Sequence, residues 1–559
     1  MDNIRERAFN IYEEWLENVD GELKEELLKL KDDEKEIIDR FYKDLEFGTG
    51  GLRGKIGAGS NRMNIYTVAR ATQGYANYLK KQKDFPSVVI AYDTRKNSEL
   101  FAKTASRVLA ANDINVFLFD QVAPTPLLSF AVRKLKTDGG IVITASHNPP
   151  EYNGYKVYTS DGTQAVPKYA NEITAEIEKL NYFKDSKIIP FEEALKNEKI
   201  SLLNEEIFND YLDEIEGYLR GLNALMDIKP IIVYTPLYGA ALKLVTGILS
   251  RLGFEVFLVE EQSKPDSNFS TLKVPNPEEK SAFELALKKA KEVKAGLVLA
   301  TDPDGDRIGI YENYNGEYIT FTGNQVGVML THFLLCKFRE YSSLKVGDYI
   351  VKTIVTTDMV KPIAEEFGVT VEETLTGFKY IGEKIEKYKN SGRRFIFGFE
   401  ESYGYLANDH ARDKDAIIAA ALISIMASEM LSKRKTLSEY LKDLKEKYGY
   451  YEEKLISFEF EGFEGAQKIN RIMNKMRKNP PVKIGEYDLL ETLDYLKGIE
   501  GLPKSDVVEL RYSKIKLIGR PSGTEPKIKF YILVDGSTED EAQQLIKEAE
   551  SAISEIVNV

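Results

Sequence analysis

Cysteine and long apolar runs are scarce in this chain of 559 residues. Its one cysteine, Cys336, excludes an internal disulfide and fits a reducing compartment. The first residues, MDNIRERAFN, mix acids with bases and lack the apolar core of a signal peptide. The most apolar stretch, residues 416–427, is too short to span a bilayer and is predicted to form a buried helix. We therefore expect a cytoplasmic protein with no membrane partner.

An excess of positive charge is also absent. The net charge of −13 argues against a nucleic-acid partner and against an anionic lipid surface. A hydrophobic content of 43% and a charged content of 30% are ordinary for globular protein, so the chain can build large cores. Its length corresponds to several domains of about 100–200 residues each.

Nucleotide-binding motifs are missing, although the glycine-rich stretch at residues 47–59 invites the comparison. Arg53 and Arg62 stand where the dinucleotide fingerprint needs glycine, and Ser60 stands where a P-loop needs lysine. The sequence therefore does not predict ATP or NAD.

Alternating short apolar runs and helical patterns predict an α/β fold with mixed, mostly parallel sheets. An N-terminal helical segment, with apolar residues four apart from Ile11 to Leu27, comes first. Strands at 87–93, 114–120 and 139–146 then alternate with helices, and the same alternation restarts near residues 229 and 348. The last part differs: paired strands at 515–519 and 527–534 and a final helix, with a capping box of Thr538 and Glu541, indicate a smaller α+β domain.

The loop after the strand at 139–143 contains a candidate nucleophile, Ser146, in the sequence TASHNP. A serine at the end of a buried strand beside an imidazole, His147, suits nucleophilic chemistry. A polar loop that only satisfies backbone groups explains the hexapeptide equally well. A serine-hydrolase triad is not supported, because no G-x-S-x-G elbow surrounds the serine.

The loop after the strand at 295–300 contains Asp302, Asp304 and Asp306 in the sequence DPDGDR. Carboxylates at alternate positions repel one another unless a cation lies among them, and hard oxygen ligands suit Mg²⁺ or Ca²⁺. A solvated acidic turn is the alternative. An EF-hand is excluded, because Asn313 occupies the position of its bidentate glutamate. We predict one metal ion with open coordination positions.

A third loop, RPSGTEP at residues 520–526, offers a guanidinium, hydroxyls and backbone N–H groups for a phosphate. Taken alone, the same residues could simply form a hairpin loop.

Together with GFEESYG at residues 398–404, these loops resemble the α-D-phosphohexomutase superfamily, the phosphoglucomutases and phosphomannomutases, in the family's own order. FGTGGLRG at 47–54 and NGYKVY at 153–158 also match the family. The resemblance implies four domains in a heart shape around a central cleft, which we place at residues 1–205, 206–320, 321–435 and 436–559. The first three would be similar α/β domains and the last an α+β domain.

The resemblance also implies the reaction. A phosphoserine at Ser146 would give its phosphoryl group to a sugar monophosphate, form a bound sugar 1,6-bisphosphate and take back the other phosphate. Its phosphate would be the fourth ligand of one Mg²⁺ on the aspartates. The implied catalytic residues are Ser146, His147, Arg53, Lys156 and Lys414, with Lys414, His147 and Arg53 as candidate acid/base groups. The implied substrate-binding residues are Arg307, Thr376, Gly377, Glu400, Ser402, Arg520, Ser522, Gly523, Thr524 and Lys527.

The motifs indicate the sugar less specifically than they indicate the reaction. Tyr403-Gly404-Tyr405 replaces the Gly-His pair that many phosphomannomutases carry after the sugar-loop serine. The sequence looks most similar to the branch of bacterial α-phosphoglucomutases and phosphopentomutase-like enzymes. We expect glucose phosphates, with pentose or mannose phosphates as alternatives. A sugar-phosphate sensor without turnover and a phosphatase with an aspartate nucleophile are the hypotheses from other classes.

Overall fold

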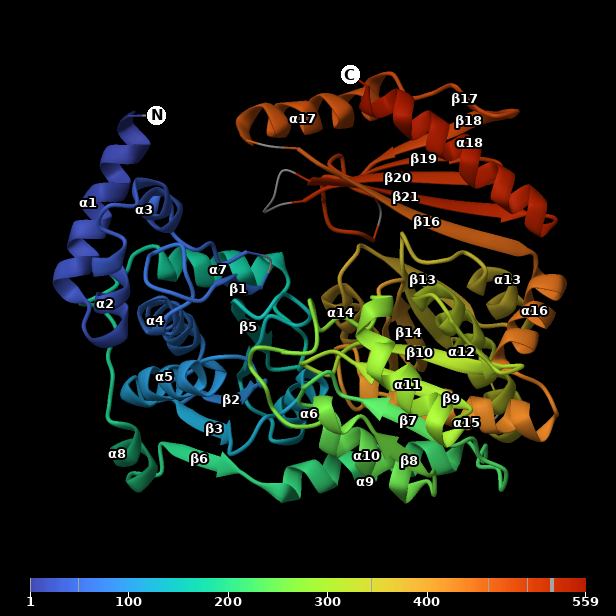
Figure 1. Cartoon of the computed structure of the whole chain (residues 1–559), viewed down its shortest axis with the longest axis horizontal. Coiled ribbons are helices and arrows are strands. Elements are labelled where there is room, and N and C mark those ends of the chain that lie inside the picture. The colour runs from blue at the N-terminus through green and yellow to red at the C-terminus, as the bar shows by residue number, and fades with distance from the viewer. Residues whose placement is uncertain are drawn as a thin grey trace. The chain divides into compact units, whose positions relative to one another are not determined.

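A computed structural model describes residues 2–48, 50–342, 344–460, 462–499, 501–522 and 527–558. The chain forms two compact units, each built from several segments (Figure 1). The first unit contains Met1–Phe321, Phe378–Phe395 and Ser402–Lys433, and the second contains Thr322–Gly377, Ile396–Glu401 and Arg434–Val559.

The first unit holds two mixed sheets. The first sheet has the order β1-β5-β4-β2-β3-β6, in which β2, β3, β4 and β6 run parallel and β1 and β5 are antiparallel to their neighbours. Its strands are β1 Gly51–Lys55, β2 Ser87–Tyr92, β3 Asn115–Phe119, β4 Gly139–Ile143, β5 Tyr152–Thr159 and β6 Ile200–Leu203. The second sheet has the order β11-β10-β9-β7-β8. Its strands are β7 Ile232–Thr235, β8 Val256–Leu258, β9 Leu297–Thr301, β10 Ile308–Tyr314 and β11 Glu317–Thr320.

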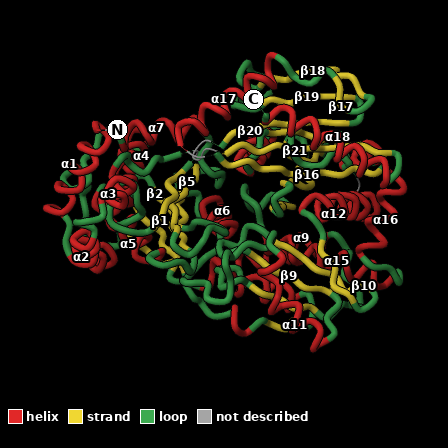
Figure 2. The backbone as a smooth tube through the Cα atoms, turned by 45° about the horizontal axis from the view of Figure 1, so that its top comes forward, coloured by secondary structure: helices red, strands yellow, loops and turns green. Residues whose placement is uncertain are grey.

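The second unit holds the parallel pair β12–β13, the strand β14, and a fully antiparallel sheet of order β16-β21-β20-β19-β18-β17. In Figure 2 the strands of this last sheet run side by side, and the C-terminal helix α18 packs on β16 and β21. The strands are β12 Tyr349–Thr353, β13 Thr370–Thr374, β14 Phe395–Glu400, β16 Tyr450–Glu459, β17 Lys483–Ile484, β18 Tyr487–Asp494, β19 Val508–Tyr512, β20 Ile515–Pro521 and β21 Lys527–Gly536, while β15 Gly404–Ala407 lies in the first unit.

Helices separate these strands as the sequence pattern predicts. Their bounds are α1 Asp2–Asn18, α2 Gly21–Lys29, α3 Glu34–Phe41, α4 Ile65–Gln82, α5 Ser98–Ala111, α6 Thr125–Lys134, α7 Pro167–Ile177, α8 Phe191–Lys196, α9 Glu205–Gly221, α10 Leu242–Arg251, α11 Glu284–Val293, α12 Gly323–Lys337, α13 Val360–Glu366, α14 Phe378–Tyr388, α15 Ala416–Ser432, α16 Leu437–Tyr448, α17 Gly462–Lys478 and α18 Glu539–Val557. The predicted fold class, three α/β domains followed by an α+β domain, is confirmed by these sheets. Each sheet falls within one of the four predicted domain ranges, whose boundaries stay a prediction.

The apolar stretch at 416–427 lies within α15, whose first turn is capped by Asp415: its Oδ1 accepts from the N–H groups of Ile417 and Ile418. Most of this helix is buried, as predicted. In the described part of the chain no single helix has the length and apolarity to cross a membrane, although α15 and α16 taken together as a bent pair pass by length and composition.

Two local predictions need correction. The N-terminal helical segment is broken: α1 ends at Asn18 and α2 begins at Gly21, so the apolar residues pack from separate helices around Trp15. At α18, Thr538 accepts from the N–H of Glu541, but the Glu541 carboxylate accepts from Ser537 instead of closing a capping box. The carboxylate reaches one residue further back because Lys514 also pairs with it.

Close packing against the N-terminal helices explains part of the glycine content of residues 47–59. Gly59 has a φ of +134°, and a Cβ atom there would lie 2.9 Å from the carbonyl oxygen of Arg40 in α3. The backbone of Ala58 is held on both sides, by Glu26 at its N–H and by Arg40 at its carbonyl. Gly59 therefore permits close packing of this stretch against α3. No nucleotide-binding role is needed to explain it.

Candidate active site

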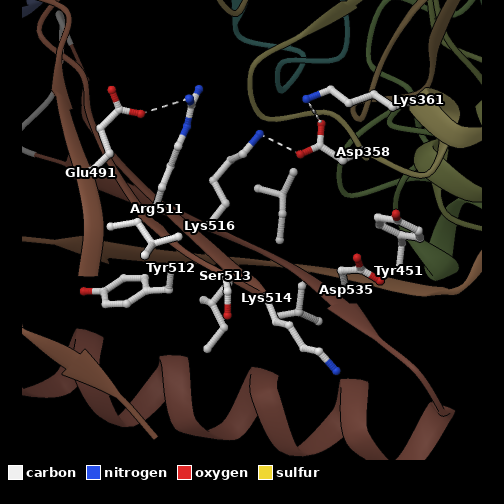
Figure 3. Close-up of a pocket in the computed structure, with 14 residues that line it drawn as sticks. Asp358, Lys361, Tyr451, Glu491, Arg511, Tyr512, Ser513, Lys514, Lys516 and Asp535 are labelled. Atoms are coloured by element: carbon white, nitrogen blue, oxygen red, sulfur yellow. Dashed lines mark hydrogen bonds and ion pairs between the residues drawn. The ribbon is translucent and has the colours of Figure 1, made fainter. Parts of the chain in front are cut away.

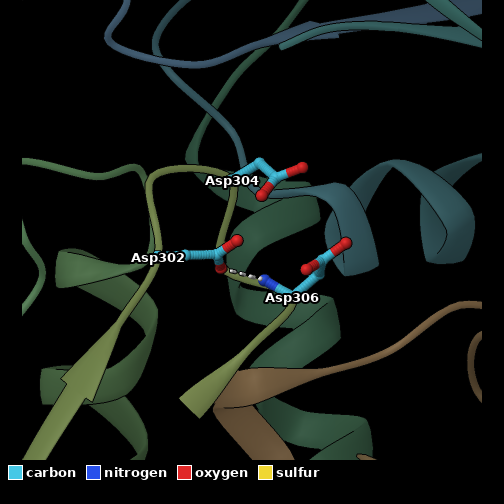
Figure 4. Close-up of side chains that lie close together, drawn as sticks. All are labelled: Asp302, Asp304 and Asp306. Atoms are coloured by element: carbon cyan, nitrogen blue, oxygen red, sulfur yellow. Dashed lines mark hydrogen bonds between the residues drawn. The ribbon is translucent and has the colours of Figure 1, made fainter. Parts of the chain in front are cut away.

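Three buried carboxylates converge on the turn between β9 and β10 (Figure 4). Asp302, Asp304 and Asp306 are exposed by 0%, 0% and 2%, and each contributes an oxygen to a set that lies within 4.8 Å. The turn is shaped by Asp302 itself, because its Oδ1 accepts from the N–H groups of Asp306 and Arg307, both at 3.0 Å. The antiparallel pairing of Thr301 with Ile308 fixes both ends of the turn.

The charges in this triad are not balanced by the protein alone. Burial and repulsion from its neighbours raise the pKa of Asp302 well above its ordinary value, and the same causes raise the pKa of Asp306. Burial would also raise the pKa of Asp304, but the nearby Lys156 outweighs it and the pKa falls. One oxygen each of Asp304 and Asp306 is buried without a hydrogen-bond partner among the residues that the structure describes. Such orphaned hard oxygens fit a divalent cation, and the triad could hold one.

Ser146 lies against this triad. The loop that follows β4 places its Oγ 2.9 Å from Oδ2 of Asp302, to which it donates, and 3.1 Å from Nδ1 of His147. The serine is 4% exposed and adopts a left-handed backbone conformation with a φ of 52°, which is rare for a residue with a side chain. Its N–H donates to Oγ1 of Thr144. The loop therefore tolerates conformational strain that points this hydroxyl at the carboxylates.

The surroundings of His147 favour its neutral form. Burial, followed by the positive charges of Arg307 and Arg53, holds its pKa well below the ordinary value. Its Nδ1 lies 3.1 Å from Oγ of Ser146, and within the described residues no carboxylate is hydrogen-bonded to its ring as a hydrolase triad requires.

Two ammonium groups pair with the triad from separate parts of the chain. Nζ of Lys156, on β5, lies 2.9 Å from Asp304, and Nζ of Lys414 lies 3.0 Å from Asp306. Thr125, at the start of α6, donates to the same oxygen of Asp304 at 3.1 Å. The structure thus brings both predicted lysines to the metal loop.

The two predicted arginines lie less directly on the triad. Arg53, on β1, donates to the side-chain oxygen of Asn148 in the serine loop at 3.2 Å. Arg307 pairs with Glu278 at 2.5 Å, and its Nε is 3.9 Å from Asp306. Both guanidinium groups are therefore close enough to supply positive charge beside the serine without bonding to it.

In the second unit, the carboxylate of Glu400 at the end of β14 accepts from the N–H of Gly377 at 2.7 Å. Glu400 is 4% exposed, and Gly377 has a φ of +118° that favours glycine. The predicted sugar-loop residues Thr376, Gly377 and Glu400 therefore share one local structure. Ser402 belongs to the first unit.

The predicted phosphate loop is described only in part. Arg520 lies near the end of β20 and Ser522 follows the strand, and the N–H of Ser522 donates to the carbonyl of Lys527 at 2.7 Å. Nζ of Lys527 pairs with Glu459 at 2.6 Å. Gly523 and Thr524 lie outside the described residues.

Arg95 is a site residue that sequence reasoning missed. Its guanidinium, on the loop after β2, donates to the carbonyls of Ser146, Asn148, Pro149 and Tyr152 and so holds the whole serine loop. Asp93 pairs with it from the same loop. The available signal was the run YDTR at the carboxyl end of a predicted strand, where ligand sites of α/β sheets lie.

A separate pocket of about 410 Å³ opens in the second unit (Figure 3). It is lined by charged and aromatic side chains from α13 and the C-terminal sheet and includes no predicted site residue. Its four cationic side chains are paired inside the protein: Lys361 and Lys516 with Asp358, Arg511 with Glu491, and Lys514 with Glu541. The cationic side chains of this pocket are therefore already paired with carboxylates of the protein.

Comparison with known proteins agrees with this arrangement. The three α/β/α domain models of phosphoglucomutase/phosphomannomutase match residues 44–183, 209–316 and 322–448. The chain belongs to this family. Family membership makes it an isomerase that transfers a phosphoryl group within its substrate, and the resemblance to the superfamily is confirmed.

Similar curated proteins cover almost the full length. A phosphoglucomutase of Staphylococcus haemolyticus is 38% identical over 90% of this chain and 93% of its own. A phosphoglucomutase of Staphylococcus aureus strain USA300 is 37% identical over 95% and 97%.

Solved structures share the fold at lower identity. A putative phosphomannomutase from Thermus thermophilus aligns with a TM-score of 0.69 at 23% identity, covering 92% of this chain and 99% of its own. Parafusin, a phosphoglucomutase from Paramecium in its open form, also gives 0.69, at 18% identity over 92% and 95%.

Proposed function

We propose that this protein is a phosphoglucomutase that interconverts glucose 1-phosphate and glucose 6-phosphate through a phosphorylated Ser146. The observation that carries the proposal is the 2.9 Å contact between the Ser146 hydroxyl and a buried aspartate triad whose negative charge is not balanced. A phosphate on this oxygen would lie beside the triad, and a cation there would offset the negative charge of both.

The triad would hold one Mg²⁺, with the phosphate of Ser146 as a further ligand, and the ion would neutralise charge on the phosphoryl group in transfer. Lys156 and Arg53 would add positive charge from the first unit. Lys414 is our candidate for the group that exchanges a proton with the sugar hydroxyl, because a neutral His147 is already turned toward the serine.

The remaining predicted residues would bind the substrate. Glu400 and Ser402, with Thr376 and Gly377 near them, would bind sugar hydroxyls, and Arg307 would bind a phosphate oxygen. Arg520, Ser522, Gly523, Thr524 and Lys527 would hold the distal phosphate, for which Lys527 must leave Glu459. We also propose the four domain boundaries given above, a sugar 1,6-bisphosphate as intermediate and primer, and a cytoplasmic location.

The decisive variant is Ser146→Ala, with Ser160→Ala, an exposed serine of the same domain, as its matched control. Intact-mass measurement of the wild type should show a fraction of molecules with one added phosphate that maps to Ser146. Ser146→Ala should lack it and lose nearly all mutase activity, whereas Ser160→Ala should keep both. Activity that survives in Ser146→Ala contradicts the mechanism.

Substrate choice is tested by comparing kcat/KM for glucose 1-phosphate, mannose 1-phosphate and ribose 1-phosphate on one preparation. We expect glucose 1-phosphate to give the highest value. A higher value for ribose or mannose 1-phosphate would make the enzyme a phosphopentomutase or a phosphomannomutase instead. Net release of inorganic phosphate would indicate a phosphatase, and binding without turnover would indicate a sensor.

A further inference from the structure

The carbonyl groups of the serine loop converge on one side chain. The guanidinium of Arg95 donates four hydrogen bonds to this loop: Nη2 to the carbonyls of Ser146 and Asn148, both at 2.5 Å, and Nη1 to those of Pro149 and Tyr152, at 2.9 and 3.1 Å. A lysine ammonium could not serve the same four acceptors, because only the planar fork of an arginine points its donors in these directions. The place of Ser146 therefore depends on where this guanidinium lies.

Asp93 holds Arg95 from the same loop. Both side chains are fully buried, and Nε of Arg95 lies 3.4 Å from Oδ2 of Asp93. The other oxygen, Oδ1, accepts from the N–H of Arg95 at 2.9 Å and from the hydroxyl of Ser98 at 2.6 Å. The carboxylate is itself fixed by these two bonds, so Asp93 determines the direction in which the guanidinium points.

A phenylalanine from a distant part of the chain covers the guanidinium. The ring centroid of Phe269 lies 5.0 Å from the guanidinium carbon of Arg95, which is a cation–π distance. Phe269 belongs to the segment between β8 and β9, in the second predicted domain, whereas the serine loop belongs to the first. It is 0% exposed, although Asn268 and Ser270 on either side of it are exposed. A single buried ring in an exposed turn indicates a specific contact.

The turn holds Phe269 in an unfavourable backbone conformation. Its φ is 49°, in the left-handed region that bulky side chains rarely adopt. Asp266 maintains the turn, because its carboxylate accepts from the N–H groups of Asn268 and Ser270, both at 3.0 Å. Strained residues of this kind cluster at functional sites, and the contact with Arg95 connects Phe269 to one.

We propose that Asp93 and Phe269 are positioning residues that hold Arg95 on the serine loop, and that this clamp of three residues keeps Oγ of Ser146 at the aspartate triad. The inference rests on the proposed function, in which that oxygen carries the phosphate. Without the clamp the loop can leave the left-handed conformation of Ser146, and the oxygen then moves away from its 2.9 Å contact with Asp302. The clamp should therefore affect turnover more than substrate binding.

The first predicted domain contains a matched arginine with no bond to the serine loop. Arg70, on α4, donates from Nε to the carbonyl of Leu180 and from Nη1 to Oδ2 of Asp44, both at 2.8 Å. Its guanidinium carbon lies 4.4 Å from the ring centroid of Tyr182, and its side chain is largely buried. Arg70→Lys therefore disturbs the same kinds of contact as Arg95→Lys, with a carbonyl, a carboxylate and an aromatic ring.

The first experiment compares these two variants by steady-state kinetics and thermal unfolding. Arg95→Lys should lower kcat at least about tenfold with KM within about twofold, because the substrate still binds while the serine is misplaced. Arg70→Lys should lower the unfolding temperature and leave kcat within about twofold of the wild type. Equal kcat values for the two variants would overturn the inference.

A milder variant covers the case in which Arg95→Lys does not fold. Phe269→Leu keeps an apolar side chain on the guanidinium and removes only the aromatic face. It should lower kcat at least about fivefold with KM within about twofold. A wild-type kcat in Phe269→Leu would overturn its role as a positioning residue.

A second measurement examines Ser146 directly. Dephosphorylated protein is mixed with glucose 1,6-bisphosphate, from which Oγ of Ser146 takes a phosphoryl group while its proton ends on the sugar oxygen that is released. Intact mass over time should show that Arg95→Lys and Phe269→Leu gain this phosphate at least about fivefold more slowly than the wild type, and Arg70→Lys at the wild-type rate. Equal rates in all four proteins would overturn the inference.

The outcomes also separate this inference from the proposed function. Full activity in Ser146→Ala would defeat the phosphoserine mechanism itself. Loss of activity in Ser146→Ala with wild-type kcat in Arg95→Lys would leave the mutase standing and overturn only the positioning role of the clamp.

Discussion

Two clusters of buried charge, one in each unit, differ in how far their carboxylates are compensated by nearby cations. In the aspartate triad three carboxylates face the ammonium groups of Lys156 and Lys414, and the pKa values of Asp302 and Asp306 are raised. In the second cluster Lys352, Lys361 and Lys516 surround Asp358 and Glu373, as Figure 3 shows in part.

The pKa values in the second cluster move in the other direction. Burial opposes ionisation of Asp358 and Glu373, but Lys352, followed by Lys516 and Lys361, outweighs it and lowers both pKa values, that of Glu373 to about 2. The lysines of the second cluster neutralise its two carboxylates, whereas the triad has more carboxylates than lysines paired with it. In the triad Asp302 and Asp306 resist ionisation and only Asp304, which pairs with Lys156, ionises more readily than usual, whereas in the second cluster both carboxylates do.

The largest expected effect comes from removing one charge of the triad. Asp302→Asn keeps the shape of the side chain but weakens the proposed metal site, so kcat should fall at least about 10³-fold, or about 4 kcal/mol. Because the change also removes repulsion, the metal-free protein should be no less stable. A clear loss of stability in urea unfolding without metal would show that the triad is structural.

The second cluster should give the opposite result. Asp358→Asn leaves Lys352, whose side chain is fully buried, with one carboxylate fewer, and should destabilise the protein by about 3 kcal/mol. Activity per folded molecule should stay within a few-fold of the wild type. The measurement is urea unfolding beside a kinetic assay of the same sample, and a stability change below about 1 kcal/mol would contradict the assignment.

Metal binding should distinguish the two clusters through its effect on stability, without a measurement of catalysis. Mg²⁺ at about 100 times its dissociation constant should stabilise the wild type by about 2.7 kcal/mol. Asp302→Asn should lose most of this stabilisation, while Asp358→Asn should keep it. An equal rise in unfolding temperature for all three proteins would place the ion elsewhere.

Acid should weaken the second cluster by about 3 kcal/mol through Glu373. A carboxyl whose folded pKa is depressed contributes stability above its ordinary pKa of 4.5, and this contribution is lost as the pH falls toward about 2. The difference in unfolding free energy between wild type and Glu373→Gln should therefore shrink over that range. A difference that stays constant down to about pH 2 would contradict the lowered pKa.

The contrast between the clusters also shows how much of each could be predicted from the sequence. DPDGDR predicted its cluster because one short turn carries all three carboxylates, and the strand before it determines where the turn lies. The three α/β sheets followed from the alternation of apolar runs for the same local reason, but of the strands in the antiparallel C-terminal sheet only those at β20 and β21 were predicted. Lys352, Asp358 and Glu373 come from a strand, a turn and a second strand, and no spacing rule links them.

The same limit applies inside the candidate site. Lys414 was a candidate only through the family resemblance, and its contact with Asp306 crosses a long stretch of the chain that no local pattern connects. Arg95 acts through tertiary hydrogen bonds to the serine loop, and its place at the carboxyl end of a predicted strand was its available sequence signal. Local motifs thus identify groups that touch the chemistry, and packing identifies the groups that position them.

The smallest effect tests whether burial, and not pairing alone, makes the second cluster structural. Lys352 and Lys361 contact the same two carboxylates at 2.9 to 3.0 Å, but their side chains are exposed by 0% and 44%. Lys361→Met should change the unfolding free energy by less than about 1 kcal/mol, because a solvated ammonium gains little from its pair. Lys352→Met should destabilise the protein more, since it leaves both carboxylates with only the outer lysines. Equal losses of unfolding free energy for the two variants would show that the ion-pair distance, and not burial, determines the stability that each lysine contributes. The second cluster would then differ from the aspartate triad only in its balance of charges.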